Sequence, residues 1–365
     1  MYLSIGQVSD FNNTKWLLRL LTSKLSEETR KLQLTGGSTY IISLPKRWIQ
    51  QNQLKKGSVI RLREEEEGGL LSILPPSLTV QKRLDEAVIR VSPKDDAEMI
   101  ARKIVSAYLA GYNSIHIKAD KQQLSAKQRH DMKIFVRGML VGTEIVTDTS
   151  SQLTLQVLLT YPELTVQSAL RRMSIITVSM HKDAILALKT RDNVLAREVI
   201  STDNEVDRFN LYVTRLLKTA TQNPRLTKEI GLADGKDCLG YRLVTKSVER
   251  TADHAVNIAE NVLTLKRDLN NDIVEKIEQM STIAINMFDT AIESLFRQDY
   301  NAAESIMKSI KEIVTLERDA VLSSQMDIED AANLRLIIES IRRTAEYACD
   351  IAEIVLDLTV DSILV

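Results

Sequence analysis

The stretch ERTADHAVNIAE, residues 249–260, decides the fold of the C-terminal half, because parts of it occur twice. Its segments Arg250-Thr251-Ala252-Asp253 and Ile258-Ala259-Glu260 recur as Arg343-Thr344-Ala345-Glu346 and Ile351-Ala352-Glu353. An earlier set, Met180, Ala184, Leu186, Asp192 and Ala196, recurs as Met287, Ala291, Glu293, Asp299 and Ala303. The apolar pattern is helical from about residue 163 onward. Each copy is too narrow to bury its own apolar stripe, so the repeat predicts two related, mutually packed helical bundles.

Residues 30–76 have a different pattern. Short β-rich runs alternate with turns at Gly36-Gly37 and Lys55-Lys56-Gly57, and Pro75-Pro76 ends the segment. A helix is expected to start near Pro45. About 45 residues of short strands without cysteine cannot bury enough apolar surface alone. The segment is therefore predicted to be a β module that forms a homodimer.

Between these two parts, strands and helices alternate. Strands are expected at 87–91, 114–118, 144–146 and 153–157, with helices at 95–109 and 126–140. The pattern predicts a small α/β layer. We therefore expect a mainly α protein with four parts: an extension at 1–28, a β module at 29–77, an α/β domain at 84–160 and a helical domain at 163–365, with repeats at about 165–268 and 271–360.

Composition and charge narrow the class of protein. The formal net charge is −1, so any nucleic-acid surface must be a local patch. Apolar runs all fall short of the roughly 18 residues that a membrane-spanning helix needs. The N-terminal residues lack the apolar core of a signal peptide. Cys238 and Cys349 show no paired spacing, which favours free thiols. Together these features predict a cytoplasmic protein.

Carboxylates lie one helical turn apart at two places in the first repeat. Asp203 and Asp207 form one pair, with Glu205 nearby, and Glu249 and Asp253 form the other, with Asn257 on the same face. If the two helices pack together, four carboxylates converge and attract a cation. All-oxygen ligands favour iron, manganese or magnesium. The alternative is that both pairs lie on solvated faces and form salt bridges with Lys246, Arg208 or Arg250.

Residues 249–260, together with Asp203-Asn204-Glu205-Val206-Asp207, resemble the signature motifs of PhoU, the phosphate-uptake regulator family. The resemblance covers roughly 165–365. It implies two three-helix bundles, metal binding through the paired acidic motifs, and negative regulation of phosphate uptake through a transporter or sensor protein. The second copy departs from this pattern, because Arg342 stands where Glu249 would recur. Glu346 and Asp350 remain as a weaker candidate metal site there, with Glu317 and Asp319 as further candidates on the same face.

The N-terminal module is similar to the AbrB/SpoVT family of swapped-hairpin barrels, in its run of strand, Leu44-Pro45 helix and Lys56-Gly57 turn. That resemblance implies dimerisation and DNA binding through basic residues. Such residues would contact phosphates and give salt-dependent binding. The candidates are Arg30, Lys31, Lys46, Arg47, Lys55, Lys56, Arg61 and Arg63. The alternative is a module that serves dimerisation alone.

Three functions follow from these patterns. The first is a phosphate-responsive, DNA-binding transcriptional regulator, since the order of domains resembles archaeal PhoU-type regulators. The second is an adaptor that acts on a phosphate transporter or sensor, with the β module holding the dimer. The third, a di-iron enzyme, is disfavoured, because neither Glu249 nor Glu346 has a histidine three residues later. We therefore expect a protein that is not an enzyme.

Overall fold

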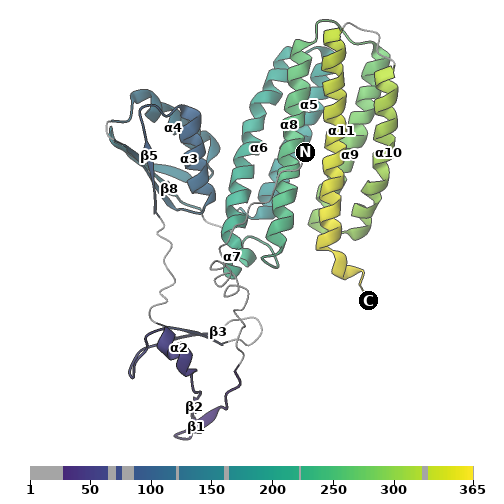
Figure 1. The fold of residues 1–365 in the computed structure, drawn as a ribbon. Coiled ribbons are helices and arrows are strands. Elements are labelled where there is room, and N and C mark those ends of the chain that lie inside the picture. The colour runs from purple at the N-terminus through teal and green to yellow at the C-terminus, as the bar shows by residue number, and fades with distance from the viewer. Residues whose placement is uncertain are drawn as a thin grey trace, which may run out of the picture. The chain divides into compact units, whose positions relative to one another are not determined.

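The computed structural model describes residues 28–64, 71–75, 86–120, 123–159, 164–221, 223–322 and 328–364. The extension expected at 1–28 lies almost wholly outside these ranges. The chain divides into two compact units, Met1–Lys82 and Arg83–Val365. Both are drawn in Figure 1, and each is described by itself.

The first unit contains two short antiparallel hairpins. Strand β1 (Gln33–Thr35) pairs with β2 (Thr39–Ile41), and β3 (Arg61–Glu64) pairs with β4 (Leu71–Leu74). Helix α2 (Lys46–Gln51) lies between the hairpins in the chain. The turn between β1 and β2 uses Gly36 and Gly37 at φ values of 63° and 81°, a backbone region that favours glycine. The β module predicted from the sequence is therefore present.

The second unit begins with a four-stranded mixed sheet in the order β5-β6-β8-β7. Its elements follow the chain as β5 (Glu86–Val91), α3 (Ala97–Leu109), β6 (Ser114–Ala119), α4 (Ala126–Met139), β7 (Thr143–Asp148) and β8 (Gln152–Val157). Strands β5 and β6 are parallel, and the other neighbours are antiparallel. Both helices start at side-chain caps: Met99 N donates to Asp96 at 2.7 Å, and Ser125 forms a capping box with Gln128.

Two three-helix bundles complete the second unit. The first contains α5 (Val166–Thr190), α6 (Asn193–Ala220) and α8 (Asp237–Thr264), with the short α7 (Pro224–Glu229) before α8. The second contains α9 (Asn271–Arg297), α10 (Tyr300–Leu322) and α11 (Ile328–Leu358), followed by the 3₁₀ turn η1 (Val360–Ser362). The bundles join along α8 and α11, which run side by side (Figure 1), and α5 also contacts α9.

The duplication is visible in the backbone as well as in the sequence. Arg191 ends α5 and Gln298 ends α9, and both adopt the left-handed conformation, at φ values of 54° and 53°. Thr251 on α8 and Thr344 on α11 are both buried, and each hydroxyl donates to the carbonyl four residues earlier. The two bundles therefore share local details that follow from a repeated sequence.

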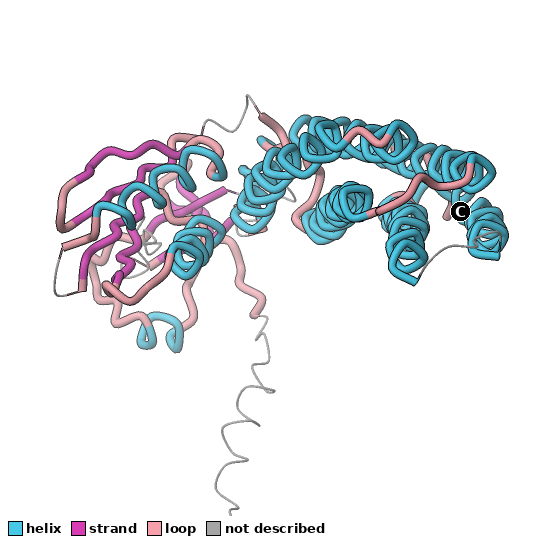
Figure 2. Tube along the Cα trace, turned by 90° about the horizontal axis from the view of Figure 1, so that it is seen from above, coloured by secondary structure: helices cyan, strands magenta, loops and turns pink. Residues whose placement is uncertain are grey.

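Helix α6 also packs against the α/β domain, beside which the long helices are seen nearly end-on in Figure 2. Its Arg215 is only 1% exposed. The guanidinium donates to the Tyr108 carbonyl at the end of α3 and to Asn113 Oδ1 at 2.8 Å, and it lies 4.8 Å from the centre of the Tyr108 ring. Helix α6 therefore belongs to two hydrophobic cores, that of the bundles and that of the α/β domain.

Candidate functional sites

Two adjacent helices carry the paired carboxylates of the first bundle. Helix α6 holds Asp203 and Asp207, and α8, which packs against it, holds Glu249 and Asp253. Glu249 is buried, the two α6 carboxylates are partly buried, and Asp253 is more exposed. The structure thus brings together the four carboxylates that the sequence placed on facing helices.

The electrostatics of these side chains indicate mutual repulsion. Burial, followed by the charges of Asp207, Asp253 and Glu249, raises the pKa of Asp203 to about 7. Burial and the Glu249 charge raise the pKa of Asp253 to about 6, and the same two causes raise the pKa of Asp207. The Oδ1 atom of Asp203 is buried and has no hydrogen-bond partner among the described residues. A cation would relieve both the repulsion and this unsatisfied atom.

Lys246 supplies part of that positive charge. Its ammonium donates to Glu249 and lowers the pKa values of Asp207 and Asp253. Lys246 and Arg250, whose charge also lowers the pKa of Asp253, face four carboxylates, so the compensation is incomplete. The salt-bridge alternative from the sequence is thus realised at Glu249, and a metal ion bound there would displace Lys246.

Glu205 and Asn257 lie outside this group. Glu205 is exposed and forms an ion pair with Arg208 at 3.7 Å, and Asn257 is exposed on α8. In the described part of the chain, no three side chains of His, Cys, Asp or Glu are arranged as a metal site. A bound metal would therefore have to draw the carboxylates of α6 and α8 closer together.

The second bundle carries an arginine at the corresponding place. Arg342 binds Glu346 one turn along α11 and Glu317 of α10, the latter at 3.3 Å. Arg343 binds the other oxygen of Glu346 at 2.9 Å. The shift that relates Asp192 to Asp299 also places Ile310 and Val314 where α6 has Asp203 and Asp207. Asp350 keeps a pKa raised by burial and by Glu353 and Glu346, while Asp319 is exposed on α10.

The basic residues of the N-terminal unit are displayed on its surface. Arg30 and Lys31 precede β1, Lys46 and Arg47 begin α2, Lys55 and Lys56 lie in the turn before β3, and Arg61 and Arg63 belong to β3. All of them except Arg63, whose side chain is not described, are exposed. Arg30 forms an ion pair with Glu28. Basic side chains of α2, of the turn before β3 and of β3 itself are thus exposed on this unit.

Apolar side chains are also exposed in this unit. Among the described residues, the buried hydrophobic side chains lie at Val91 and beyond. Leu34, Tyr40, Val59, Leu62 and Leu71 are 57–78% exposed in a single copy of the chain. So many exposed large apolar side chains on one small unit mark an interaction surface.

Sequence reasoning missed Arg215. The only signal is a charged residue inside the apolar run of α6, between Thr214 and Leu216. Such a residue on an amphipathic helix usually extends its charge to solvent. Its burial depends on the packing of the α/β domain, which the sequence of α6 does not reveal.

The fold of the second unit indicates the class of protein. It is a protein with two related three-helix bundles attached to a small α/β domain. Comparison with family models assigns the parts. The PhoU domain model matches residues 170–262 and again 277–355, and the model of the MazE bacterial antitoxin, a protein for antidote-toxin recognition, matches residues 33–76. The chain therefore contains two PhoU domains preceded by a MazE/AbrB-type unit. By these matches the chain is similar to a family of phosphate-transport proteins that are not enzymes.

The chain is also similar to individual proteins. A protein of Borreliella burgdorferi described as a "phosphate-specific transport system accessory protein PhoU homolog" is 23% identical over 190 residues, which are 47% of this chain and 81% of the relative. The PhoU structures from Streptococcus pneumoniae and Pseudomonas aeruginosa each align with 19% identity and a TM-score of 0.47. They cover 55% and 54% of this chain and 96% of each solved chain. Within the described residues, none of the helices is long and apolar enough to cross a membrane.

Proposed function

We propose that the protein is a phosphate-responsive transcriptional regulator that dimerises and binds DNA through its N-terminal unit and controls phosphate uptake. The observation that carries the proposal is the joining of two PhoU domains to a MazE/AbrB-type unit with exposed basic side chains in one chain. PhoU domains connect the chain to phosphate transport, and the curated relative named above is an accessory protein of such a system.

The basic residues of the N-terminal unit are the proposed DNA contacts. Lysine and arginine that neutralise phosphates release counterions, so binding should weaken steeply as salt is raised. Exposed basic side chains on β3, on α2 and in the turn before β3 suit this role. Because the whole chain has a formal net charge of −1, DNA binding would depend on this local patch.

A second copy of the chain is the proposed partner of the exposed apolar side chains. With Leu34, Tyr40, Val59 and Leu62 exposed, the described residues of one copy of the N-terminal unit form no buried hydrophobic core. Pairing two copies would bury these side chains and place two basic patches on one assembly, which is what a DNA-binding dimer requires.

The carboxylates of α6 and α8 are the proposed metal ligands. The first choice is Asp203, Asp207, Glu249 and Asp253. Glu205 and Asn257 are the secondary candidates. Their all-oxygen character fits iron, manganese or magnesium. The buried, unsatisfied oxygen of Asp203 supports a cation at this place. A bound ion would cross-link α6 to α8 and keep these carboxylates ionised. In the second bundle Arg342 already provides a positive charge, so Glu346 and Asp350 form the weaker candidate.

The DNA-binding proposal is tested by titrating the full chain into phosphate-transporter promoter fragments and into unrelated fragments of equal length, at several salt concentrations. Wild type is compared with Lys46→Ala/Arg47→Ala and with a control, Lys118→Ala/Lys127→Ala, which removes two exposed lysines of the α/β domain. We expect salt-sensitive, promoter-selective binding that only the first variant loses.

If all three proteins bind DNA only at background level, the proposed role in transcription is wrong. That result would favour the second candidate, an adaptor that acts on a phosphate transporter or sensor protein. The exposed apolar side chains of the N-terminal unit also suit that candidate, in which this unit serves dimerisation alone.

A further inference from the structure

The duplication places Arg191 and Gln298 at equivalent positions, and their surroundings differ in a way that suggests a ligand. The shift that relates Asp192 to Asp299 also relates Arg191 to Gln298. Both residues end the first helix of their bundle in the left-handed conformation. Each side chain therefore leaves the backbone at the equivalent point of its bundle. From there it faces the C-terminal end of the third helix of that bundle.

In the first bundle, the Arg191 guanidinium closes the end of α8. It donates to the Leu265 carbonyl at 2.7 Å and to the Val262 carbonyl at 3.5 Å, and it lies 3.4 Å from Asp268. These acceptors lie at the C-terminal end of a helix, where the backbone carbonyls carry partial negative charge. A positive charge at this place is stabilising.

The second bundle has corresponding residues at the end of α11, but glutamine takes the place of the arginine. The shift that relates Arg250 to Arg343 relates Val262, Leu265 and Asp268 to Val355, Leu358 and Asp361. At this end Gln298 replaces the arginine, and a cavity of about 230 Å³ lies against Gln298, Val355 and Leu358. Thr359 N and its hydroxyl donate to Val355 O, and the chain continues into η1, so the two helix ends are similar without being identical.

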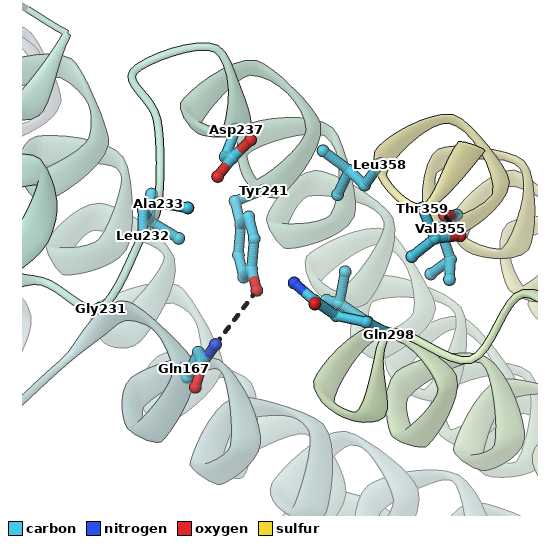
Figure 3. Close-up of a pocket in the computed structure, with 11 residues that line it drawn as sticks. Gln167, Gly231, Leu232, Ala233, Asp237, Tyr241, Gln298, Val355, Leu358 and Thr359 are labelled. Carbon is cyan, nitrogen blue, oxygen red and sulfur yellow. Dashed lines mark hydrogen bonds between the residues drawn. The ribbon is translucent and has the colours of Figure 1, made fainter. Parts of the chain in front are cut away.

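The remaining walls of the cavity come from the first bundle (Figure 3). Gln167 of α5 donates to the Tyr241 hydroxyl of α8 at 3.3 Å, and Asp237 stands at the start of α8. The Gln298 amide points toward the Tyr241 side of the pocket (Figure 3). Among the described residues that line the cavity, Asp237 is charged and the others are neutral. The end of α11, a carboxylate and side-chain hydrogen-bond acceptors therefore lie around it.

We propose that this pocket binds a guanidinium group supplied from outside the bundle, in the place that Arg191 fills from within at the other end. The planar guanidinium presents five donors, which suits separate carbonyl, carboxylate and amide oxygens better than a point-charge ammonium does. Water takes up about 30 Å³ per molecule in the liquid, so the cavity has room for a guanidinium and part of its alkyl chain. The group would be either the side chain of an arginine in a partner protein or a free small molecule.

The first test uses wild-type, full-length protein and N-acetyl-arginine amide, with binding followed by calorimetry and by ligand-observed NMR. N-acetyl-citrulline amide, which has nearly the same shape and no charge, and N-acetyl-lysine amide are the comparison ligands. We expect the arginine compound to bind at least about tenfold more tightly than either of them, since charge-assisted hydrogen bonds are the stronger kind. Equal binding of the citrulline compound, or binding of none of the three, would overturn the proposal.

Free L-arginine, tested in the same way, distinguishes the sources of the guanidinium. Binding of the blocked amide with loss of affinity for free arginine points to a side chain within a protein. Binding of both with similar affinity points to a small molecule. Either result supports the guanidinium site.

Variants test whether the arginine compound binds in this pocket. Gln298→Arg should fill the pocket from within, as Arg191 does, abolish binding of the arginine compound and raise the melting temperature. Its control, Gln279→Arg, adds the same charge on an exposed position of the same helix and should bind like wild type. Asp237→Asn should weaken binding and leave the fold intact. Undiminished binding by Gln298→Arg would show that the ligand is bound elsewhere and would reject this pocket.

Discussion

Arg215 on α6 donates to Asn113 Oδ1 at 2.8 Å, and this contact, together with its bond to the Tyr108 carbonyl, fixes the α/β domain to the first bundle. The arginine is buried, and its guanidinium is held by polar acceptors and by the Tyr108 ring. Buried charge is costly unless it is fully hydrogen-bonded. Arg215 therefore contributes to the specificity of this interface.

Arg215→Met is expected to destabilise the chain by about 3 kcal/mol, because it leaves the Tyr108 carbonyl and Asn113 facing an apolar side chain. Urea unfolding followed by circular dichroism measures the loss. The control is Arg267→Met at an exposed position, which should change stability by less than about 0.5 kcal/mol. Similar stability of the two variants would mean that Arg215 is not needed for docking.

Arg342 is expected to hold α10 against α11. Arg342→Ala removes ion pairs to Glu317 and Glu346, which are partly buried, and should cost about 1–2 kcal/mol. Arg343→Ala removes a more exposed contact to the same Glu346 and should cost less than about 1 kcal/mol. Thermal unfolding of both proteins compares them directly. A larger loss in Arg343→Ala would contradict the assignment of Arg342 as the internal cation.

The carboxylates of α6 and α8 predict how stability depends on pH in the absence of metal. An acid whose folded pKa is raised binds its proton more tightly in the folded state than in the unfolded state. Stability is therefore highest below the unfolded pKa and falls as pH rises toward the folded pKa. With Asp203 at about 7 and Asp253 at about 6, the fall should extend from about pH 4 to pH 7 and then level off.

In Asp203→Asn, the fall in the free energy of unfolding between about pH 4 and pH 7 should be smaller by about 2 kcal/mol, after allowance for solvent screening. Urea unfolding at pH 5, 6, 7 and 8, in a buffer with chelator, measures the difference. Glu205→Gln, which changes an exposed carboxylate on the same helix, is the matched control and should follow wild type. A variant profile parallel to that of wild type would contradict the raised pKa of Asp203.

Metal addition provides an independent test at neutral pH. Mn²⁺, Fe²⁺ or Mg²⁺ should raise the melting temperature of wild type, because a ligand that binds the folded state alone stabilises it. The effect should be smaller in Asp203→Asn/Asp253→Asn and retained in Glu346→Gln/Asp350→Asn. Elemental analysis of the protein after dialysis identifies the ion. An equal shift in all three proteins would place the metal outside these carboxylates.

We predict that the proposed dimer depends on the apolar side chains of the N-terminal unit. Leu62→Asp should convert the protein to a monomer, as measured by light scattering across a range of concentrations. Val194→Asp is the control, because Val194 is 76% exposed on α6 and Leu62 is 62% exposed. If Leu62→Asp remains as dimeric as wild type, the exposed side chains serve another partner.

The sequence was sufficient for the parts of the fold that depend on local periodicity. Both bundles, the α/β layer and the β module were predicted from apolar spacing, turn residues and the repeat, and the structure and family models confirm them. The convergence of Asp203 and Asp207 with Glu249 and Asp253 was foreseeable, because each pair lies on one helix face. Lys246 as the partner of Glu249 was only one of the alternatives that spacing left open.

Other features could not be predicted because they depend on how distant segments meet. Arg215 is buried only because α3 of the α/β domain packs over α6. The relation of Arg191 to Gln298 is present in the repeat offset, but the carbonyls that Arg191 reaches are set by where α8 ends. Likewise, Arg342 could be recognised as a replacement for a carboxylate, whereas its contact with Glu317 required the placement of α10.

Each half of the duplicated region is completed by an arginine at a different place. Arg342 stands among the carboxylates of the second half, and Arg191 closes the helix end of the first. The similarity of the two bundles is thus broken at two places. At one place the second bundle has the arginine, and at the other place the first bundle has it. A protein built from two equal halves would present the same face after a half turn, and a partner could engage it in two orientations. The two arginines make the bundles chemically different, so a partner that recognises either site could tell one bundle from the other.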